Sequence, residues 1–549
     1  MQRPGRRGGE ATVGALLVKW IPVAHTSMLP AKPIESPTPV AGAWGTVAGA
    51  WGTVAGAWGT RAGRGRAGEY SRRVADHVFD VVVVGAGPAG EVLAGRVAER
   101  GGRRVAIVER DHVGGECAFY ACMPSKALLR PAEVLAEARR VPGAAEAISR
   151  GLDVQAVLDR RDEVIHRLDD SSQLPWLDDR QVTLFRGSGR LDGERRVTVA
   201  DDVLLAREAV VLAVGSAALM PPIPGLVEAS AWSNREITTA EAVPASLVIL
   251  GGGVVGVEMA QAWASLGSKV TIVESSGRLI AREEPFAGEL VADALRGLGV
   301  ELRLGVKAVG VGATGPSEFN LELEDGSSVR GERLLVAVGR RPLTADLGLE
   351  TVGIEGGGYL DVDDHLRVDG HDWLYAIGDA NGRALLTHIG KYQGRIAADH
   401  ILGEARAVAF ADTLGAPRVV FTDPQVAAVG PTLAQALERG AGAIAIDLPT
   451  DTPAGASFVG RGAPGSCRFV VDTEREILLG VTFSGPGVSD FLQAASIAVI
   501  AEVPLSTLAH AVAPFPTRLE LWPAFLEAYE RERGVTVHAT GLEADGMGR

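Results

Sequence analysis

Two glycine-rich turns constrain the fold of this chain more than any other feature. They run from Gly85 to Gly90 and from Gly251 to Gly256, and each follows a short apolar strand and opens a helix. A strand, such a turn, a helix and a second strand form a βαβ unit of a parallel sheet. The segments expected around the turns are strands 79–84 and 104–109 with helix 89–99, and strands 246–250 and 269–274 with helix 257–266. The sequence therefore predicts an α/β fold with two doubly wound, Rossmann-like dinucleotide-binding domains.

The first turn has the glycine spacing of a dinucleotide-binding site. Gly85 permits the tight turn, Gly87 lets the backbone approach a pyrophosphate, and Gly90 allows the helix to pack closely on the strand. The N-terminus of the helix offers N–H groups to the phosphates. Glu109 ends the following strand, where a carboxylate can bind a ribose 2′-hydroxyl.

The second turn repeats the arrangement. Gly251, Gly253 and Gly256 have the same spacing, and Glu274 closes the second strand. An acidic residue at that place favours the free 2′-hydroxyl of NADH and repels the 2′-phosphate of NADPH. Arg278 lies nearby in the sequence and opposes this preference, so we expect NADH and keep NADPH as the alternative.

Length and charge narrow the class of protein. A chain of 549 residues is long enough for about three or four domains. The formal net charge of −14 argues against a nucleic-acid surface, which needs a basic stripe to neutralise phosphates. No apolar run approaches the roughly 18 residues that span a bilayer. We therefore expect neither a nucleic acid nor a membrane as a partner.

The chain contains three cysteines, Cys117, Cys122 and Cys467. So few thiols do not suit a secreted disulfide scaffold, and we expect a cytoplasmic protein. A close pair beside a nucleotide-binding motif indicates a catalytic dithiol instead. Because no further Cys or His ligands cluster with the pair, we expect no metal site. Cys467 is expected to be a core residue.

The segment from Gly114 to Lys126 resembles the redox motif of the class I pyridine nucleotide-disulfide oxidoreductases. It reads Gly-Gly-Glu-Cys-Ala-Phe-Tyr-Ala-Cys-Met-Pro-Ser-Lys. This family includes dihydrolipoamide dehydrogenase, glutathione reductase and mercuric reductase, and the motifs are nearest to the first. Further matching segments follow in order at Val211–Ser216, Val336–Pro342 and Leu374–Asp379.

The resemblance implies a domain plan and two cofactors. FAD is expected in the first dinucleotide site and NADH, or NADPH, in the second, in a homodimer whose active sites combine residues of both subunits. A C-terminal α+β dimerisation domain is expected, whereas three AGAWGT repeats indicate a disordered low-complexity leader. The expected bounds are 1–76 for the leader, 77–222 and 346–414 for the two parts of the FAD-binding domain, 223–345 for the NAD(P)-binding domain and 415–540 for the dimerisation domain.

The resemblance also implies roles for single residues. Cys122 is the implied flavin-proximal thiolate, and Cys117 is the interchange thiol. Lys126 is implied to lie near flavin N5, paired with Glu258. Further implied cofactor contacts are Asp379 at the ribityl chain, Thr387 near the flavin through its backbone, and Gly215 and Gly339 in the matching segments. The physical chemistry agrees for Cys122, because Pro124 suits the first turn of a helix, whose N-terminus stabilises a thiolate.

One departure from the family pattern concerns the acid/base group. Disulfide-reducing members carry a His-Pro dipeptide with a Glu five positions after the His, supplied by the partner subunit. Here the matching stretch has Phe515 in place of the histidine, while Glu520 is retained. Loss of a positioned acid/base costs about 10²–10⁴-fold in rate. His510 and Tyr120 are the alternative bases.

The sequence therefore predicts an FAD-dependent oxidoreductase of the dihydrolipoamide dehydrogenase type. Electrons are expected to pass from NADH through FAD to the Cys117–Cys122 pair and on to a disulfide, a quinone or another small acceptor. A metal reductase similar to mercuric reductase is one alternative, although residues 541–549 lack the usual C-terminal cysteine pair. A flavin and dithiol redox sensor that does not turn over is the other.

Overall fold

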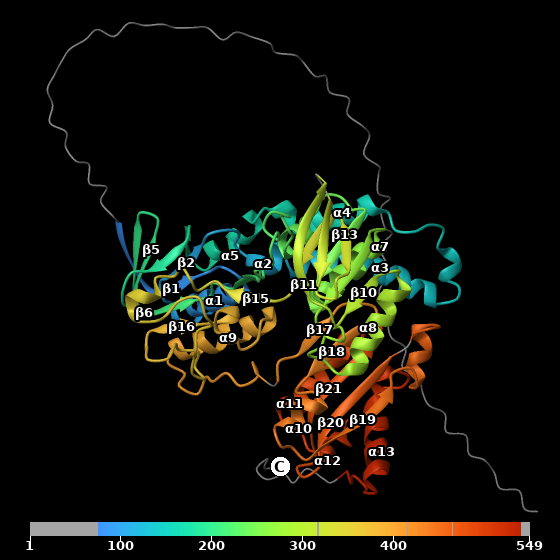
Figure 1. The fold of residues 1–549 in the computed structure, drawn as a ribbon. Coiled ribbons are helices and arrows are strands. Elements are labelled where there is room, and N and C mark those ends of the chain that lie inside the picture. Colours follow the sequence, from blue (N-terminus) through green and yellow to red (C-terminus); the bar gives the residue numbers. More distant parts are fainter. Residues whose placement is uncertain (1–74, 316–317, 414, 464, 540–549) are drawn as a thin grey trace, which may run out of the picture. The chain divides into compact units, whose positions relative to one another are not determined.

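The computed structural model describes residues 75–315, 318–413, 415–463 and 465–539. The first glycine turn follows the central strand of a mostly parallel sheet with the order β3-β2-β1-β6-β5-β4, in which β16 also pairs with β6 (Figure 1). The strands are β1 (Ala75–Val84), β2 (Val105–Glu109), β3 (Thr183–Arg186), β4 (Gly189–Leu191), β5 (Arg196–Val199), β6 (Asp202–Leu212) and β16 (Leu374–Ala376). Val81, Val82 and Val83 of β1 are fully buried, as expected for a parallel strand covered on both faces.

Two helices pack closely against each other beside this sheet, α1 (Pro88–Gly101) and α9 (Thr387–Ile401). A Cβ atom at Gly394 would lie 2.6 Å from the carbonyl oxygen of Ala89, so only glycine allows this approach. Arg96 on α1 and Asp399 on α9 form a two-pronged ion pair with both distances at 2.6 Å. This packing carries the N-terminus of α9 toward the first glycine turn.

The second glycine turn belongs to a four-stranded parallel sheet with the order β10-β9-β8-β14. Its strands are β8 (Ser246–Leu250), β9 (Lys269–Glu274), β10 (Glu301–Leu304) and β14 (Arg333–Val336), with helices α7 (Val254–Ser265) and α8 (Pro285–Gly297). Helix α7 is buried along most of its length, and Trp263 is fully buried. The smaller sheets consist of β11 (Ala308–Gly315), β12 (Glu318–Leu323) and β13 (Ser328–Gly331), and of β7 (Ser216–Ala218) and β15 (Arg340–Pro342).

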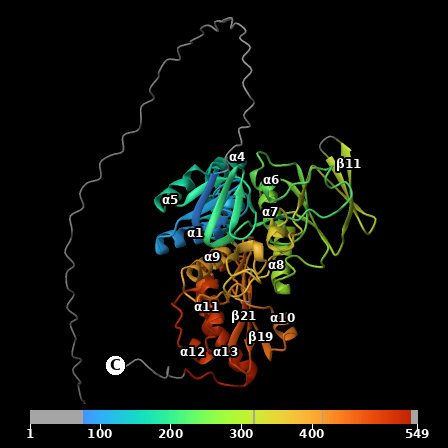
Figure 2. The same cartoon turned by 90° about the vertical axis from the view of Figure 1, so that its left-hand side faces the viewer.

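The C-terminal sheet is antiparallel and has the order β17-β18-β21-β20-β19. It consists of β17 (Arg418–Val420), β18 (Gln425–Val429), β19 (Ala443–Pro449), β20 (Ser466–Asp472) and β21 (Ile477–Gly485). Helices α10 (Leu433–Glu438), α11 (Leu492–Ile500), α12 (Leu505–Leu508) and α13 (Leu521–Arg533) accompany it (Figure 2). Phe469 of β20 and Phe525 of α13 stack with ring centroids 4.2 Å apart, which joins the sheet to its helix.

Four further α-helices lie between β2 and β3 in the chain: α2 (Gly115–Phe119), α3 (Cys122–Arg140), α4 (Val154–Val164) and α5 (Leu174–Asp179). Helix α6 (Asn234–Thr239) lies between β7 and β8. The domain after residue 415 is tied to the second sheet by ion pairs of Arg418 with Glu283 and of Arg468 with Glu284, both at 2.8 Å. The Arg418 pair holds β17, which reaches the cavity described below.

The fold class predicted from the sequence is confirmed. Each glycine turn lies in a βαβ unit within a few residues of the expected bounds, and an α+β domain follows. In that domain a 3₁₀ turn, Val488–Phe491, continues directly into α11. The leader lies outside the described residues, and the domain bounds stay predictions. Within the described ranges, no helix has the length and apolar character needed to cross a bilayer.

Candidate functional site

Both glycine turns and the cysteine pair line one continuous cavity of about 2020 Å³. Its lining includes Gly87, Gly253, Cys117 and Cys122. Residues far apart in the sequence therefore meet at one site, as an enzyme with two dinucleotides and a dithiol requires.

The first turn fits a dinucleotide. Gly85 has a φ of +109°, and a Cβ there would lie 2.3 Å from the Ala213 carbonyl oxygen. A Cβ at Gly90 would lie 2.0 Å from the Gly85 carbonyl oxygen, so close helix–strand packing requires glycine. A Cβ at Gly87 meets nothing nearer than 4.0 Å, so this backbone borders open space in the cavity. The space beside Gly87, at the N-terminus of α1, suits a pyrophosphate.

Glu109 joins the end of β2 to this turn. One carboxylate oxygen accepts the Ala86 N–H and the other accepts the Asp111 N–H, both at 2.8 Å. Each carboxylate oxygen can accept a second hydrogen bond. Glu109 therefore retains the capacity to bind a ribose hydroxyl at the cavity wall.

The glycines of the second turn have the same structural roles as those of the first. A Cβ at Gly251 would lie 2.5 Å from the Ala337 carbonyl oxygen, and one at Gly256 would lie 2.0 Å from the Gly251 carbonyl oxygen. A Cβ at Gly253 would meet nothing within 4 Å. The second turn therefore also leaves space for a pyrophosphate at a helix N-terminus.

Glu274 lies at the end of β9 and lines the cavity. It accepts the N–H of Gly252 at 2.5 Å and that of Ser276 at 2.6 Å. Burial alone raises the pKa of Glu274, but these hydrogen bonds outweigh it and hold the pKa below the usual value. The nearby Arg278 donates to the carbonyl oxygens of Glu283 at 2.8 Å and Ala281 at 2.6 Å. Glu274 is therefore an ionised carboxylate, and Arg278 is bonded to its own loop.

The cysteine pair lies where two helices meet. Cys117 is on the short helix α2, and Cys122 is the first residue of α3. The Cys122 sulfur lies 3.3 Å from the Thr387 hydroxyl oxygen at the start of α9. A hydrogen bond from Cys117, helped by Thr387 and the charge of Lys126, lowers the pKa of Cys122 to about 6 against the opposing effect of burial. The same contact, together with burial, raises the pKa of Cys117. These opposite shifts favour a thiolate at Cys122 and a protonated thiol at Cys117.

Lys126 and Glu258 form an ion pair beside the thiolate. The Lys126 ammonium donates to Glu258 Oε2 at 2.8 Å, and Glu258 Oε1 accepts the Phe421 N–H at 3.0 Å. The Lys126 Nζ also lies 4.7 Å from the centre of the Phe421 ring. The Glu258 side chain is only 3% exposed, so loss of either partner would leave a buried polar group without its hydrogen bond.

The other residues expected at the cofactors also line the cavity: Gly215, Gly339, Asp379 and Thr387. Asp379 accepts a hydrogen bond from the Ser216 hydroxyl at 2.5 Å, and burial raises its pKa. Gly215 has a φ of +72°, and a Cβ there would meet nothing within 4 Å. The structure thus brings together all the residues predicted for the two cofactors except Gly90 and Gly256, which pack helix on strand.

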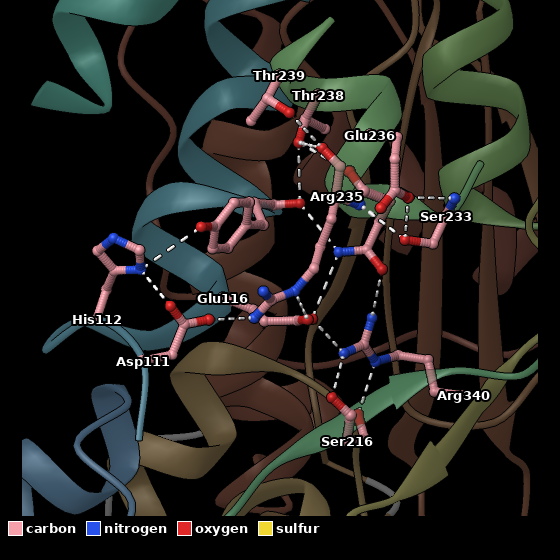
Figure 3. Close-up of polar contacts among 12 residues, drawn as sticks. Asp111, His112, Glu116, Ser216, Ser233, Arg235, Glu236, Thr238, Thr239 and Arg340 are labelled. Atoms are coloured by element: carbon pink, nitrogen blue, oxygen red, sulfur yellow. Dashed lines mark hydrogen bonds and ion pairs between the residues drawn. The ribbon is translucent and has the colours of Figure 1, made fainter. Parts of the chain in front are cut away.

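Sequence reasoning missed a polar network around Glu116, the residue before Cys117. Arg235 and Arg340 both donate to its carboxylate, and Arg235 also donates to Asp111 at 2.7 Å (Figure 3). Glu116 lies inside the redox motif, and Arg340 lies in the segment Val336–Pro342. The sequence signal that could have pointed to a role for these two residues is their place inside segments that match the family.

Phe515 and Glu520 are not among the described residues that line this cavity. The Phe515 side chain is 75% exposed, and Glu520 Oε2 is buried without a hydrogen-bond partner among the described residues. His510 lies in an exposed turn after α12, outside the cavity lining. Tyr120 lines the cavity, and the Arg235 guanidinium lies 4.2 Å from its ring centre. Cys467 is fully buried in β20, as expected for a core residue.

Known proteins are similar to this chain in sequence and in structure. Residues 79–394 match the family model described as pyridine nucleotide-disulphide oxidoreductase, and residues 416–524 match the dimerisation domain of that family. A dihydrolipoyl dehydrogenase of Haloferax volcanii is 32% identical over 84% of this chain and 97% of its own length. A mercuric reductase of Acidithiobacillus ferrooxidans is 32% identical over 80% of each chain.

Solved structures similar to this chain include those of RclA and LpdA. RclA of Escherichia coli, a HOCl-induced flavoprotein disulfide reductase solved as a Cu(II) complex, has a TM-score of 0.72 and 25% identity over 82% of this chain and 99% of its own. LpdA of Mycobacterium tuberculosis has a TM-score of 0.72 and 27% identity over 84% of this chain and all of its own. Taken with the two glycine turns and the dithiol in one cavity, these matches show that the chain belongs to the class I pyridine nucleotide-disulphide oxidoreductases, a family that uses FAD and NAD(P)H.

Proposed function

We propose that this enzyme oxidises NADH and passes the electrons through FAD and the Cys117–Cys122 pair to a small acceptor that needs no histidine to supply a proton, a quinone foremost. The observation that carries the proposal is the place of the pair, because Cys117 and Cys122 both line the cavity shared by the two dinucleotide sites. The lowered pKa of Cys122 and the raised pKa of Cys117 support a thiolate at Cys122 and a protonated thiol at Cys117.

The two cofactors are assigned to the two glycine turns. FAD would be held by the turn from Gly85 to Gly90, Glu109, Gly215, Asp379 and Thr387, and the nicotinamide dinucleotide by the turn from Gly251 to Gly256, Glu274 and Gly339. When bound, the flavin supplies the chemistry that couples hydride donors to thiol pairs. Lys126 and Glu258 would orient this part of the cavity, because their ion pair lies directly beside Cys122.

NADH is preferred over NADPH on electrostatic grounds. The carboxylate of Glu274 is ionised and lines the cavity next to the second turn, where it would repel a 2′-phosphate. Arg278, the cation that opposes this preference in the sequence, donates to two carbonyl oxygens of its own loop. Its guanidinium is therefore engaged away from a 2′-phosphate.

The acceptor class follows from the proton on Cys117. Attack on a substrate disulfide requires a thiolate, and the pKa of Cys117 is raised by its hydrogen bond to Cys122 and by burial. A neighbouring base would have to remove that proton. Phe515, at the position of the family's histidine, cannot do so. Acceptors that take electrons without attack by Cys117 therefore suit this site better than lipoamide does.

The enzyme would act as a cytoplasmic homodimer. It contains the family's dimerisation domain, and several large apolar side chains of that domain are exposed in the single chain. They are Phe458, Ile497, Val512 and Phe515. Burial of these side chains by a second copy would stabilise a dimer and bring Phe515 to an interface.

Parallel assays of NADH oxidation with lipoamide and with a soluble quinone test the proposal. We expect steady quinone turnover, slow lipoamide turnover and a higher kcat/KM for NADH than for NADPH. Fast lipoamide turnover would refute the proposed acceptor class. A single round of reduction by NADH that stops with both acceptors would identify a sensor instead.

A metal reductase is the second candidate. A thiolate at Cys122 beside a second sulfur is a ligand pair for soft metal ions, and mercuric reductase and a Cu(II)-bound disulfide reductase are among the similar proteins. This candidate predicts NADH oxidation that depends on Hg²⁺ or Cu²⁺ and is lost in Cys117→Ser. Metal-independent rates with both ions would exclude it.

A further inference from the structure

We propose that Glu116 is a positioning residue that holds the Cys117 helix in place through a clamp formed by Arg235 and Arg340. The inference rests on the proposed redox role of the Cys117–Cys122 pair. It concerns the helix that carries Cys117, whose sulfur stabilises the thiolate of Cys122. Neither Glu116 nor the two arginines were assigned a role from the sequence.

The clamp is defined by direct contacts. The Glu116 carboxylate accepts from Arg340 at 2.6 Å and from the Arg235 Nε at 3.0 Å, and the Asn234 amide nitrogen lies 3.4 Å away. The Glu116 side chain is 23% exposed and that of Arg340 is 24% exposed, so the pair is partly shielded from water. Hydrogen bonds to charged groups are stronger than those between neutral groups.

Both arginines are themselves held firmly. Arg340 also donates to the hydroxyl and the carbonyl oxygen of Ser216, at 2.6 and 2.7 Å (Figure 3). Ser216 in turn donates to Asp379. Arg235 lies in the first turn of α6, whose start is fixed by a capping box between Ser233 and Glu236. The clamp therefore holds Glu116 in a fixed position relative to α6, which carries Arg235, and β15, which carries Arg340.

The Cys117 helix needs such support. Helix α2 has only five residues, and its N-cap, Gly114, provides no side-chain hydrogen bond. A helix this short is not stable on its own. At its C-terminal end, Asn234 and Thr238 of α6 donate to the Tyr120 carbonyl oxygen at 3.0 and 3.1 Å. Glu116 supplies the anchor at the other end, next to the cysteine.

The position of Cys117 determines how strongly the thiolate of Cys122 is stabilised. The hydrogen bond from Cys117 is the largest cause of the lowered pKa of Cys122. The other groups that act on the pair are Thr387 and Lys391 on α9, Lys126 on α3 and Glu258 on α7. None of these belongs to the clamp, and Glu116 is flanked by two guanidinium groups that offset its charge. Loss of Glu116 would therefore act through the position of the Cys117 sulfur.

The chemical step affected is reduction of the pair. Two electrons, from NAD(P)H by way of the flavin in the enzyme or from dithiothreitol in the test below, and one proton break the sulfur–sulfur bond, leaving the proton on Cys117 and the negative charge on Cys122. The bonded sulfurs are about 2.05 Å apart, so closing the bond again requires Cys117 to face Cys122. A displaced α2 would hinder closure and weaken the hydrogen bond that stabilises the thiolate.

The test measures the pH midpoint of iodoacetamide alkylation at Cys122 by mass spectrometry, in flavoprotein reduced with dithiothreitol. Glu116→Gln is expected to raise the midpoint by about one pH unit, because the stabilising hydrogen bond weakens. Arg340→Gln is expected to shift it in the same direction, and the double variant by no more than the larger single shift. Arg340→Lys, which keeps the charge but loses the guanidinium fork, should give a smaller shift of the same sign.

Glu163→Gln is the matched control, because Glu163 pairs with Arg160 at 2.6 Å on the exposed face of α4. Its midpoint should equal that of the wild type. An unchanged midpoint in Glu116→Gln, or in Arg340→Lys should the first variant not fold, would overturn the proposal. The assay uses neither NADH nor an acceptor. Failure of the proposed function would therefore appear separately, as a pair that dithiothreitol and an oxidant do not interconvert between dithiol and disulfide.

Discussion

The contact between Thr387 and Cys122 allows a quantitative prediction. The Thr387 hydroxyl lies 3.3 Å from the Cys122 sulfur and contributes to lowering the pKa of Cys122 to about 6. In Thr387→Val the shape is kept and the donor is lost, and a hydrogen bond to a charged group contributes about 1.5–3 kcal/mol. Since one pKa unit corresponds to about 1.4 kcal/mol, the pKa of Cys122 should rise by about 1–2 units.

The direction of the pH effect follows from the lowered pKa. The reactive thiolate is present above that pKa and is lost as the pH falls through it. At pH 7 about nine tenths of wild-type Cys122 is ionised, whereas about a quarter would be ionised with a pKa near 7.5. The alkylation rate of Cys122 between pH 5 and 9 measures this shift. Thr198→Val is the control, because Thr198 donates to the Arg190 carbonyl oxygen at an exposed contact away from the cysteines. Equal midpoints in Thr387→Val and wild type would refute the assigned contact.

Three further predictions follow from the site. Phe515→His should raise kcat with lipoamide by about tenfold or more if the missing base is limiting, and an unchanged kcat would point to the pocket instead. Gly87→Ala should keep the melting temperature of the flavin-free protein but lower bound flavin per chain, whereas Gly90→Ala, whose Cβ would lie 2.0 Å from the Gly85 carbonyl oxygen, should lower the melting temperature itself. Glu91→Gln concerns a buried carboxyl whose pKa burial raises from 4.5 to about 7, so wild-type stability falls between these pH values as the unfolded chain ionises first. The variant should exceed the wild type by roughly 3 kcal/mol at pH 8 and match it near pH 4, and equal melting temperatures at both would contradict this assignment.

The features of this site that could be predicted from the sequence are those fixed by residues close together in the chain. A glycine at position 85 or 251 is required by the turn itself, so the βαβ units could be recognised from the residues alone. The dithiol was recognisable because Cys117 and Cys122 lie five positions apart beside the first turn. The ion pair between Lys126 and Glu258, whose residues are 132 positions apart, was expected only through the resemblance.

The clamp around Glu116 could not be predicted in this way. Its partners Arg235 and Arg340 are 119 and 224 positions away, and no periodicity in the sequence links them. Their meeting depends on how α6 and β15 pack against the redox helix. The same holds for Arg278, which opposed NADH in the sequence but is bonded to its own loop in the structure. The partners of charged side chains are therefore the features of this site that could be identified only from the fold.

The central claim is that the Cys117–Cys122 pair stores electrons in addition to the flavin. Anaerobic titration with dithionite measures this directly, as electrons taken up per bound flavin in the wild type and in Cys122→Ser. The account predicts that the wild type takes up twice as many electrons as the variant, because the variant cannot form the disulfide. Equal uptake by the two proteins, with equal flavin content, would contradict it.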